Sequence, residues 1–172
     1  HEDFEAAAAL IEQRASEKGI KKGNAKYQQR YAFSSKIICG ECNRAFARKG
    51  WRTPSGDRKV WQCSERYKVK GVLGCGNRHI YEDMLIEIYL MAWNRLLEYR
   101  EMLMPEWEEK IQGVDLLAKF RVMDFMEITK DAEPIKELNI DLMLRTVNYI
   151  KVYENGMVVT VFLDGTEIEW KK

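Results

Sequence analysis

All four cysteines of this chain lie between positions 39 and 75. Cys39 and Cys42 are separated by two residues, of which the first is Gly40. This spacing lets both thiolates point at one metal ion from a tight turn, and glycine permits that turn. Four thiolates complete a tetrahedral shell and leave no open position for a substrate. The pattern therefore predicts a structural Zn²⁺ site with the ligands Cys39, Cys42, Cys63 and Cys75.

The second cysteine pair is spaced more widely than the first. Eleven residues separate Cys63 from Cys75, whereas about two to four are usual in structural zinc sites, so the segment Ser64–Gly74 must loop out and return. Two disulfides, an iron site or free thiols are alternative interpretations. Nothing marks the chain as secreted, which favours reduced thiols and a metal. His79 is an alternative ligand, but four cysteines already complete the shell, so a polar or DNA-facing histidine is favoured.

The net charge of +1 conceals a strong asymmetry along the chain. From Arg14 to Ile80 there are 17 Lys/Arg and four Asp/Glu residues. The rest of the chain holds 11 Lys/Arg and 23 Asp/Glu residues. A metal-held module this basic favours a polyanionic partner. An anionic membrane is a weaker alternative, because no amphipathic basic helix is present in this stretch. A solvated, lysine-rich surface without a partner is the other alternative.

The residues before the cysteines divide into two predicted segments. Residues 1–19 are predicted to form a connector helix, because apolar residues recur at helical spacing and Gly19 then ends the pattern. Residues 20–35 are basic and dotted with aromatics but hold few aliphatic side chains. We therefore predict an extended basic linker there.

Residues 36–80 are predicted to form a zinc β-ribbon. The segments Ala45–Arg48 and Arg58–Gln62 favour the two strands of a hairpin, and the tip Gly50–Asp57 carries the turn sequence Pro-Ser-Gly-Asp. One cysteine pair precedes this hairpin and another cysteine ends it. A metal can hold together strands that are too short to bury a core of their own.

Residues 81–172 are predicted to form a helical subdomain that ends in a three-stranded sheet. Apolar residues at steps of three and four predict a helix from Tyr81 to Leu103 that is broken by Pro105. A second helical run is predicted from Leu116 to Met126, and Asn139 is expected to cap a short helix.

The C-terminal strands are predicted from β-branched and aromatic residues at Tyr149–Tyr153, Met157–Leu163 and Thr166–Trp170, with Asn-Gly and Asp-Gly turns between them. The predicted fold class is therefore α+β: a small zinc β-ribbon, then a helical segment, then a C-terminal antiparallel β-meander. No apolar run approaches the ~20 residues that span a membrane, and no basic, then apolar start suggests a secretory signal.

No motif for catalysis accompanies these elements. There is no glycine-rich phosphate loop of the Walker type. No serine stands in a recognisable setting with a histidine and a carboxylate, and the chain has only two histidines. We therefore expect no catalytic residue in this chain and favour a binding module over an enzyme.

Short segments from the whole length of the sequence carry a family likeness: His1–Glu5, Phe33–Cys42, Val60–Cys63, Tyr149–Tyr153 and Phe162–Thr166. They resemble the C-terminal region of the large serine recombinases, which are the phage integrases and transposon resolvases of bacteria. The cysteine-containing segment is the most specific of them, and the closing segments add independent weight because they lie far away in the sequence.

This resemblance implies a zinc-ribbon domain that follows a catalytic domain and a recombinase DNA-binding domain in the parent protein. The catalytic domain, whose serine forms a phosphoserine link to DNA, is not in this sequence, so no serine here takes that role. The cysteines match the family's zinc ligands. The family also implies that the ribbon docks into the major groove of the attachment site and that the basic linker runs along the duplex. Many members carry a long coiled coil in the zinc domain, but no sustained heptad pattern is present here.

We therefore expect a DNA-binding zinc-ribbon module of a large serine site-specific recombinase, which recognises attachment-site DNA for integration, excision or transposition. The expected cofactor is structural Zn²⁺. The expected partners are double-stranded DNA and, through the parent protein, other recombinase subunits, with no membrane. The expected location is the bacterial cytoplasm, in association with the nucleoid.

The expected DNA contacts fall into groups by their place in the sequence. Flexible linker cations are expected to contact phosphates; these are Lys21, Lys22, Lys26 and Arg30. A two-stranded ribbon can read bases in the major groove, where arginine pairs with guanine at two points; the candidates are Arg44, Arg48, Lys49, Arg52, Arg58 and Lys59. Trp51 is expected either to stack on DNA or to pack over the metal site. Further phosphate contacts are expected from Lys68, Lys70 and Arg78.

Two other functions stay open on the sequence. The first is a protein-interaction zinc ribbon that uses the acidic helices as its docking surface; a shallow salt dependence of duplex binding would favour it. The second is a stand-alone enzyme with a structural zinc, which needs a pocket of convergent ionisable groups.

Overall fold

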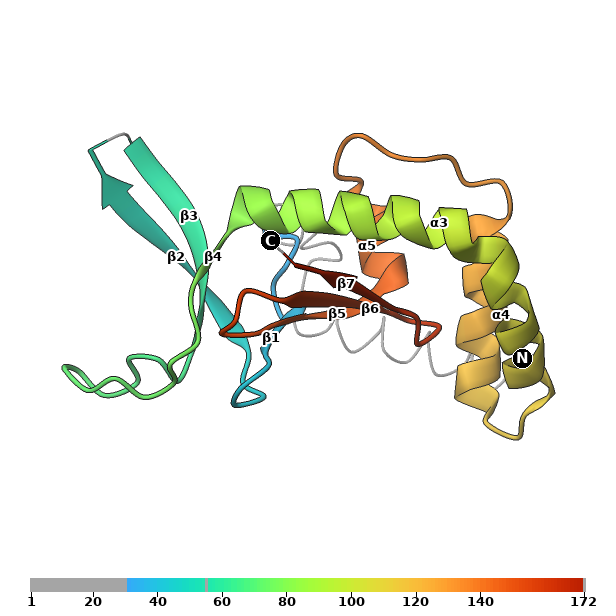
Figure 1. Cartoon of the computed structure of the whole chain (residues 1–172), viewed down its shortest axis with the longest axis horizontal. Helices are drawn as coiled ribbons and strands as arrows, with labels where there is room; N and C mark the ends of the chain where they lie inside the picture. The colour runs from blue at the N-terminus through green and yellow to red at the C-terminus, as the bar shows by residue number, and fades with distance from the viewer. Residues whose placement is uncertain (1–30, 55, 172) are drawn as a thin grey trace, which may run out of the picture. The chain divides into compact units, whose positions relative to one another are not determined.

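A computed structural model describes residues 31–54 and 56–171, and Phe33–Lys172 form one compact unit. The predicted connector helix, residues 1–19, and residues 20–30 of the predicted linker lie outside the described residues. The described part contains two β-sheets and the helices α3, α4 and α5 (Figure 1). The predicted α+β class is confirmed, since a ribbon precedes the helices and antiparallel strands close the chain.

The first sheet is the β-ribbon. β2 (Phe46–Thr53) pairs antiparallel with β3 (Gly56–Cys63), which pairs in turn with the short β4 (Ile80–Tyr81). Both long strands reach further toward the tip than the sequence predicts, because cross-strand pairing continues to the last residue of β2. The tip predicted at Gly50–Asp57 is therefore too long. Gly56 has a φ of 114°, which glycine adopts without a steric penalty, so the turn can be this tight.

The second sheet has the strand order β1-β5-β6-β7. β5 (Val147–Val152), β6 (Val158–Phe162) and β7 (Glu167–Trp170) form an antiparallel meander. These strands lie where the sequence predicts them, with each end within two residues of its expected position. The local pattern of β-branched residues and turns was therefore sufficient to place them.

The sheet also takes a fourth strand, β1 (Ile37–Cys39), which pairs parallel with β5. The sequence predicts a three-stranded sheet, so this strand is an addition. The pairing is extended at both ends, because Ile150 N donates to Lys36 O (2.7 Å) and Gly40 N donates to Val152 O (2.8 Å). β1 thereby covers an edge of β5 that would otherwise expose unpaired backbone groups.

α3 (Glu82–Gln112) is a single helix that runs through Pro105. The sequence predicts a break at this proline, and that prediction is wrong. Proline removes one backbone hydrogen bond and bends a helix without always ending it, and the last turns of α3 run in a different direction from the rest (Figure 1). The helix resumes because the next turn is anchored: Trp107 is fully buried, and its Nε1 donates to Asp164 Oδ2 (2.7 Å).

Two shorter helices follow α3. α4 (Leu116–Lys130) begins at Asp115, whose side chain accepts hydrogen bonds from two backbone amides of the first turn. α5 (Ile140–Thr146) begins at Asn139, whose side chain accepts from Leu142 N, so the predicted cap is confirmed. Among the described helices, none combines the length and the apolar content that crossing a membrane requires.

The core lies between α3, α4 and the second sheet. The ring of Phe125 on α4 faces those of Trp93 and Trp107 on α3 and Phe162 on β6, with centroids 5.8 to 6.4 Å apart. All four side chains are buried. Figure 1 shows α3 running alongside the strands β5–β7, and its first residue follows directly on β4 of the ribbon. The core therefore fixes the position of α3, and α3 continues directly into the ribbon through β4.

Candidate metal centre and basic ribbon

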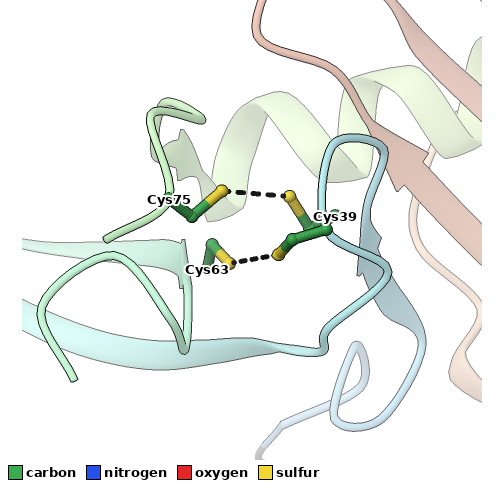
Figure 2. A group of neighbouring side chains, drawn as sticks. Cys39, Cys63 and Cys75 are labelled. Atoms are coloured by element: carbon green, nitrogen blue, oxygen red, sulfur yellow. Dashed lines mark hydrogen bonds between the residues drawn. The ribbon is translucent and has the colours of Figure 1, made fainter. Parts of the chain in front are cut away.

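Three separate segments bring the cysteines together. Cys39 ends β1 and Cys42 follows in the adjoining turn, Cys63 ends β3, and Cys75 lies in the loop before β4. The four Sγ atoms lie within 4.8 Å of one another. Figure 2 shows Cys75 and Cys39 facing each other, with Cys63 pointing into the same space.

The separations between sulfurs distinguish a metal site from disulfides. The Sγ atoms of Cys39 and Cys75 are 3.6 Å apart, and those of Cys42 and Cys63 are 3.4 Å apart. A disulfide bond is about 2.05 Å long, whereas a tetrahedron with Zn–S bonds of about 2.3 Å places its sulfurs about 3.8 Å apart. All four cysteines are free. The two-disulfide alternative is therefore contradicted, and the cluster fits one tetrahedrally coordinated ion.

The protonation of the thiols in this cluster depends on whether a cation is bound. Burial raises the pKa of Cys63 and of Cys75, so both favour the neutral thiol in the absence of a positive charge. Burial acts on Cys39 in the same sense, but hydrogen bonds from the Asn77 side chain and from the backbone of the adjoining turn outweigh it and lower the Cys39 pKa to about 7. A bound divalent ion favours the thiolate at every ligand position.

The turn that carries Cys39 and Cys42 is held against the second sheet. A Cβ atom on Gly40 would lie 2.3 Å from the ring of Tyr153, so only glycine fits between this turn and that ring. Asn43 completes the turn with a φ of 59°, a left-handed conformation that asparagine tolerates. The sulfur cluster is thus fastened to β5 as well as to the ribbon.

Asn77 supports the cluster from outside the ligand set. Its side chain is fully buried, and Nδ2 lies 3.1 Å from Cys39 Sγ and 2.6 Å from Val152 O. It therefore donates both to a sulfur and to the sheet. Groups that hydrogen-bond to metal ligands orient them and tune metal affinity. Sequence reasoning missed this residue, because a lone asparagine beside a cysteine forms no recognisable pattern.

His79 lies away from the sulfurs. Its ring stands 4.4 Å from that of Trp51 and 5.2 Å from that of Tyr81, measured between centroids. Within the described residues, the group that could share a metal consists of the cysteines without His79. The substitute-ligand interpretation is therefore contradicted. Trp51 is half-buried against this histidine.

The hairpin carries cations on both faces. Side chains alternate between the faces of a strand, and paired residues share a face. The register places two sets on opposite faces, namely Arg48, Arg52 and Lys59 on one and Lys49, Trp51 and Arg58 on the other. The exposed cations of the hairpin are Lys49, Arg52, Arg58 and Lys59.

Arg48 is held by the first turn of α3. Its Nη2 donates to Glu82 Oε1 (2.9 Å) and its Nε donates to Oε2 of the same carboxylate. Trp61 Nε1 also donates to Glu82 Oε2 (3.0 Å). One carboxylate thus ties both strands of the hairpin to α3. Sequence reasoning did not find Glu82, because its partners lie on β2 and β3 and no local pattern joins them.

The other predicted DNA contacts lie outside the hairpin. Arg44 Nε and Lys68 Nζ approach the carboxylate of Glu65, at 3.9 and 3.0 Å. Lys70 and Arg78 are exposed. The predicted linker contacts Lys21, Lys22, Lys26 and Arg30 lie outside the described residues. Of the predicted DNA contacts, those of the hairpin therefore lie together on β2 and β3.

Two grooves bear on the question of an active site. One of about 590 Å³ lies between α3 and β7, and one of about 400 Å³ lies between β3 and the start of α3. Neither groove is lined by a cysteine, a histidine or a serine. Neither groove therefore contains a Ser–His or Cys–His pair.

Residues 32–94 match the family model of the recombinase zinc beta ribbon domain. The matched segment contains all four cysteines, the whole hairpin, Asn77 and Glu82. This match confirms that the sequence predicts a recombinase zinc ribbon correctly. No curated protein matches the chain.

The similarity in fold extends beyond the ribbon. The chain is similar to a crystal structure of an LSR (large serine recombinase)–DNA complex, with a TM-score of 0.53 and 15% sequence identity over 91% of this chain. The match covers 62% of the other chain, so the present sequence spans less than two thirds of its length. At this identity the likeness shows a shared fold, which includes the helices and the C-terminal sheet.

Proposed function

We propose that this chain, whose residues 32–94 match the recombinase zinc beta ribbon domain, is the DNA-binding module of a serine site-specific recombinase. The observation that carries the proposal is the β2–β3 hairpin, which is anchored at its base by the sulfur cluster and exposes cations on both faces. The fold shared with a protein in complex with DNA supports the same function. The module would recognise attachment-site DNA for integration, excision or transposition.

In this proposal Zn²⁺ is bound by Cys39, Cys42, Cys63 and Cys75. The ion supplies no reaction, because four thiolates leave no open coordination position. Its work is mechanical: it joins the end of β1, the end of β3 and the loop before β4 at one point. A hairpin anchored in this way can meet a duplex in one orientation.

The hairpin is the proposed reader of bases. A two-stranded ribbon fits the major groove, which is about 12 Å wide. Arg52 and Arg58 lie on opposite faces near the tip and are exposed, so each can present a guanidinium to a guanine edge. Arg48 is already bound by Glu82, and we assign it to holding the hairpin in place. Lys49 and Lys59 would contact bases or flanking phosphates.

Phosphate contacts are assigned to residues around the cysteines and to the linker. Arg44, Lys68, Lys70 and Arg78 surround the cysteine-containing loops, and Lys21, Lys22, Lys26 and Arg30 precede them in the sequence. Such contacts fix register on the duplex without reading its sequence. Other recombinase subunits would be met through the parent protein, and the expected location is the bacterial cytoplasm with the nucleoid.

The proposal is tested by selecting bound duplexes from a pool with a randomised core and then titrating the selected duplex and a scrambled one. We expect affinity to fall steeply with salt and the Arg52→Ala variant to lose about 1–3 kcal/mol on the selected duplex, with less loss on the scrambled one. Arg121→Ala, an exposed cation on α4, is the matched control and should bind as the wild type does. Absence of any salt-dependent duplex binding by the wild type would overturn the proposal.

A second candidate function, protein interaction, is favoured by one observation. α4 exposes the apolar side chains Leu116, Phe120 and Met123, which recur at steps of four and three and so share one face. We infer that a second subunit carrying the same helix is the partner that covers this face. Sedimentation should then show a concentration-dependent dimer that Phe120→Lys abolishes. A monomer at every concentration would remove this candidate and leave the DNA proposal intact.

A further inference from the structure

The segment Ser64–Gly74, here called the cysteine loop, is closed tightly where it leaves the sulfur cluster. Gly74 N donates to Arg66 O (2.8 Å), and Cys75 N donates to Glu65 O (3.3 Å). A Cβ atom on Gly74 would lie 2.2 Å from Glu65 O, so the outgoing and returning segments of the loop touch at this glycine. The loop therefore has a narrow neck, and its ends are the metal ligands Cys63 and Cys75.

The polar groups of the neck are largely satisfied within the protein. Arg66 Nη1 donates to the carbonyl oxygens of Gly76 (2.7 Å) and Asn77 (2.5 Å), which ties the loop to the segment after Cys75. Lys68 Nζ lies 3.0 Å from Glu65 Oε1. At the tip, Val72 N donates to Val69 O (3.1 Å). The loop is thus ordered in advance of binding, which lowers the entropy that a partner must overcome.

Apolar side chains crowd the tip of this ordered loop. Tyr67, Val69, Val72 and Leu73 are 54%, 61%, 56% and 57% exposed. Loops of this length are ordinarily polar, and a cluster of exposed apolar groups on a fixed scaffold marks a surface that contacts another molecule. Within the described residues Arg66 stacks over the Tyr67 ring at 5.4 Å, yet all four side chains stay more than half exposed and so are available to another molecule.

The charge around the tip identifies the class of partner. Lys68 and Lys70 alternate with the apolar side chains and Arg78 follows, whereas Glu65 is the only acid between Ser64 and Arg78. Figure 1 shows the loop and the hairpin projecting from the same end of the described unit, as two arms. A basic surface favours a polyanionic partner. Because this one adjoins the proposed DNA reader, a nucleic acid is a better candidate than an acidic protein.

We propose that the cysteine loop is a second DNA-contacting arm, whose apolar tip packs into the minor groove beside the major groove that the hairpin occupies. Proteins that enter the minor groove place aliphatic side chains against the sugars and base steps, with Lys or Arg beside them on the phosphates. Val69, Val72 and Leu73 supply the apolar contact and Lys70 the cation. The inference rests on the proposed function, since it adds an arm to the same DNA-binding module.

The test compares three variants of the whole chain on the duplex that the selection described above yields. Val69→Ser/Val72→Ser/Leu73→Ser removes apolar contacts but no charge, so we expect affinity to fall on the order of tenfold with an unchanged salt slope. Lys70→Ala should lower the salt slope by about one. Leu117→Ser, on α4 and as exposed as Leu73, is the matched control and should bind like the wild type. Zinc content should stay equal in all of them.

Competition with distamycin, a minor-groove ligand, then assigns the groove. Distamycin should weaken duplex binding by the wild type more than by the triple variant. For Leu73→Ser alone, the effect of distamycin should lie between these two. Equal effects on wild type and variant would overturn the minor-groove contact. A triple variant that binds as tightly as wild type would overturn the second arm but leave the hairpin proposal standing. A wild type that binds no duplex would overturn both.

Discussion

The ribbon and the helical half of this molecule are stabilised by different means. In the helical half, Trp93, Trp107, Phe125 and Phe162 pack edge-to-face in a buried core. The ribbon buries its apolar residues only near its base, and both faces of its outer half are exposed. The sulfur cluster stands at that base, where a core would otherwise have to be.

The difference shows what a metal permits in a small module. A hydrophobic core requires that most side chains point inward, because stability comes from apolar area removed from water. A metal clamp uses only its ligands, so the remaining side chains of β2 and β3 are available for solvent or a partner. The region proposed to bind DNA is therefore the region whose stability depends least on its own side chains.

Removing the metal should have the largest effect and should separate the two regions. Structural zinc supplies about 10–16 kcal/mol to modules of this kind, so chelation is expected to abolish order in β2 and β3 while the aromatic core persists. Hydrogen exchange should show rapid exchange of hairpin amides and continued protection of β6 amides. Simultaneous loss of protection in both regions would show that they unfold as one unit.

Truncating the aromatic core should have the next largest effect, and in the opposite region. Phe125→Ala is expected to lower the free energy of unfolding by about 3–5 kcal/mol, because it leaves a cavity between α3, α4 and β6. Phe120 lies on the same helix but is 70% exposed, against 1% for Phe125, so Phe120→Ala should change stability by less than about 0.5 kcal/mol. Thermal unfolding measures both variants, and equal effects would contradict the assigned core.

A smaller effect is expected at the junction between metal and sheet. Asn77→Ala removes the donor to Cys39 Sγ and should weaken metal affinity by about 10–100-fold, as outer hydrogen bonds to metal ligands do. Asn77→Asp keeps the size of the side chain but places a negative charge beside the thiolate, so a greater loss is expected. Competition with a chromophoric chelator measures both. Unchanged affinity in the two variants would assign Asn77 to the sheet alone.

The smallest effect is expected at the joint between the hairpin and α3. Glu82→Gln removes the charge that binds Arg48 and Trp61 and should lower stability by about 1–2 kcal/mol, since both contacts are only partly buried. The indole N–H resonance of Trp61 should shift as its acceptor changes. Glu87→Gln, exposed on the same helix, is the control and should leave that resonance in place.

The sequence was informative wherever structure follows from neighbouring residues. The sulfur cluster could be predicted because two cysteines on one turn are a chemical signature that needs no tertiary information. The hairpin and the C-terminal meander could be predicted because turn residues and β-branched strands are local signals. α5 was predicted with its cap for the same reason, since Asn139 acts within one helical turn.

Tertiary contacts account for what the sequence did not reveal. Pro105 was expected to end α3, but burial of Trp107 and its hydrogen bond to Asp164 come from a distant turn and outweigh a local preference. The link from Arg48 to Glu82 and the role of Asn77 depend on elements that meet only after folding. The pairing of β1 with β5 is not foreshadowed by any periodicity, because a three-residue strand is too short to show one.

That parallel pairing has a consequence for how the protein is made. Ile37 pairs with Ile150, so the strand that leads into the first cysteines finds its neighbour only after more than a hundred further residues have been translated. On the ribosome, all four cysteines emerge well before that neighbour does, and zinc can be captured while the rest of the chain is still being translated. Contacts between such distant segments form slowly. We therefore expect the cysteine cluster to bind zinc before β5 is available to pair with β1.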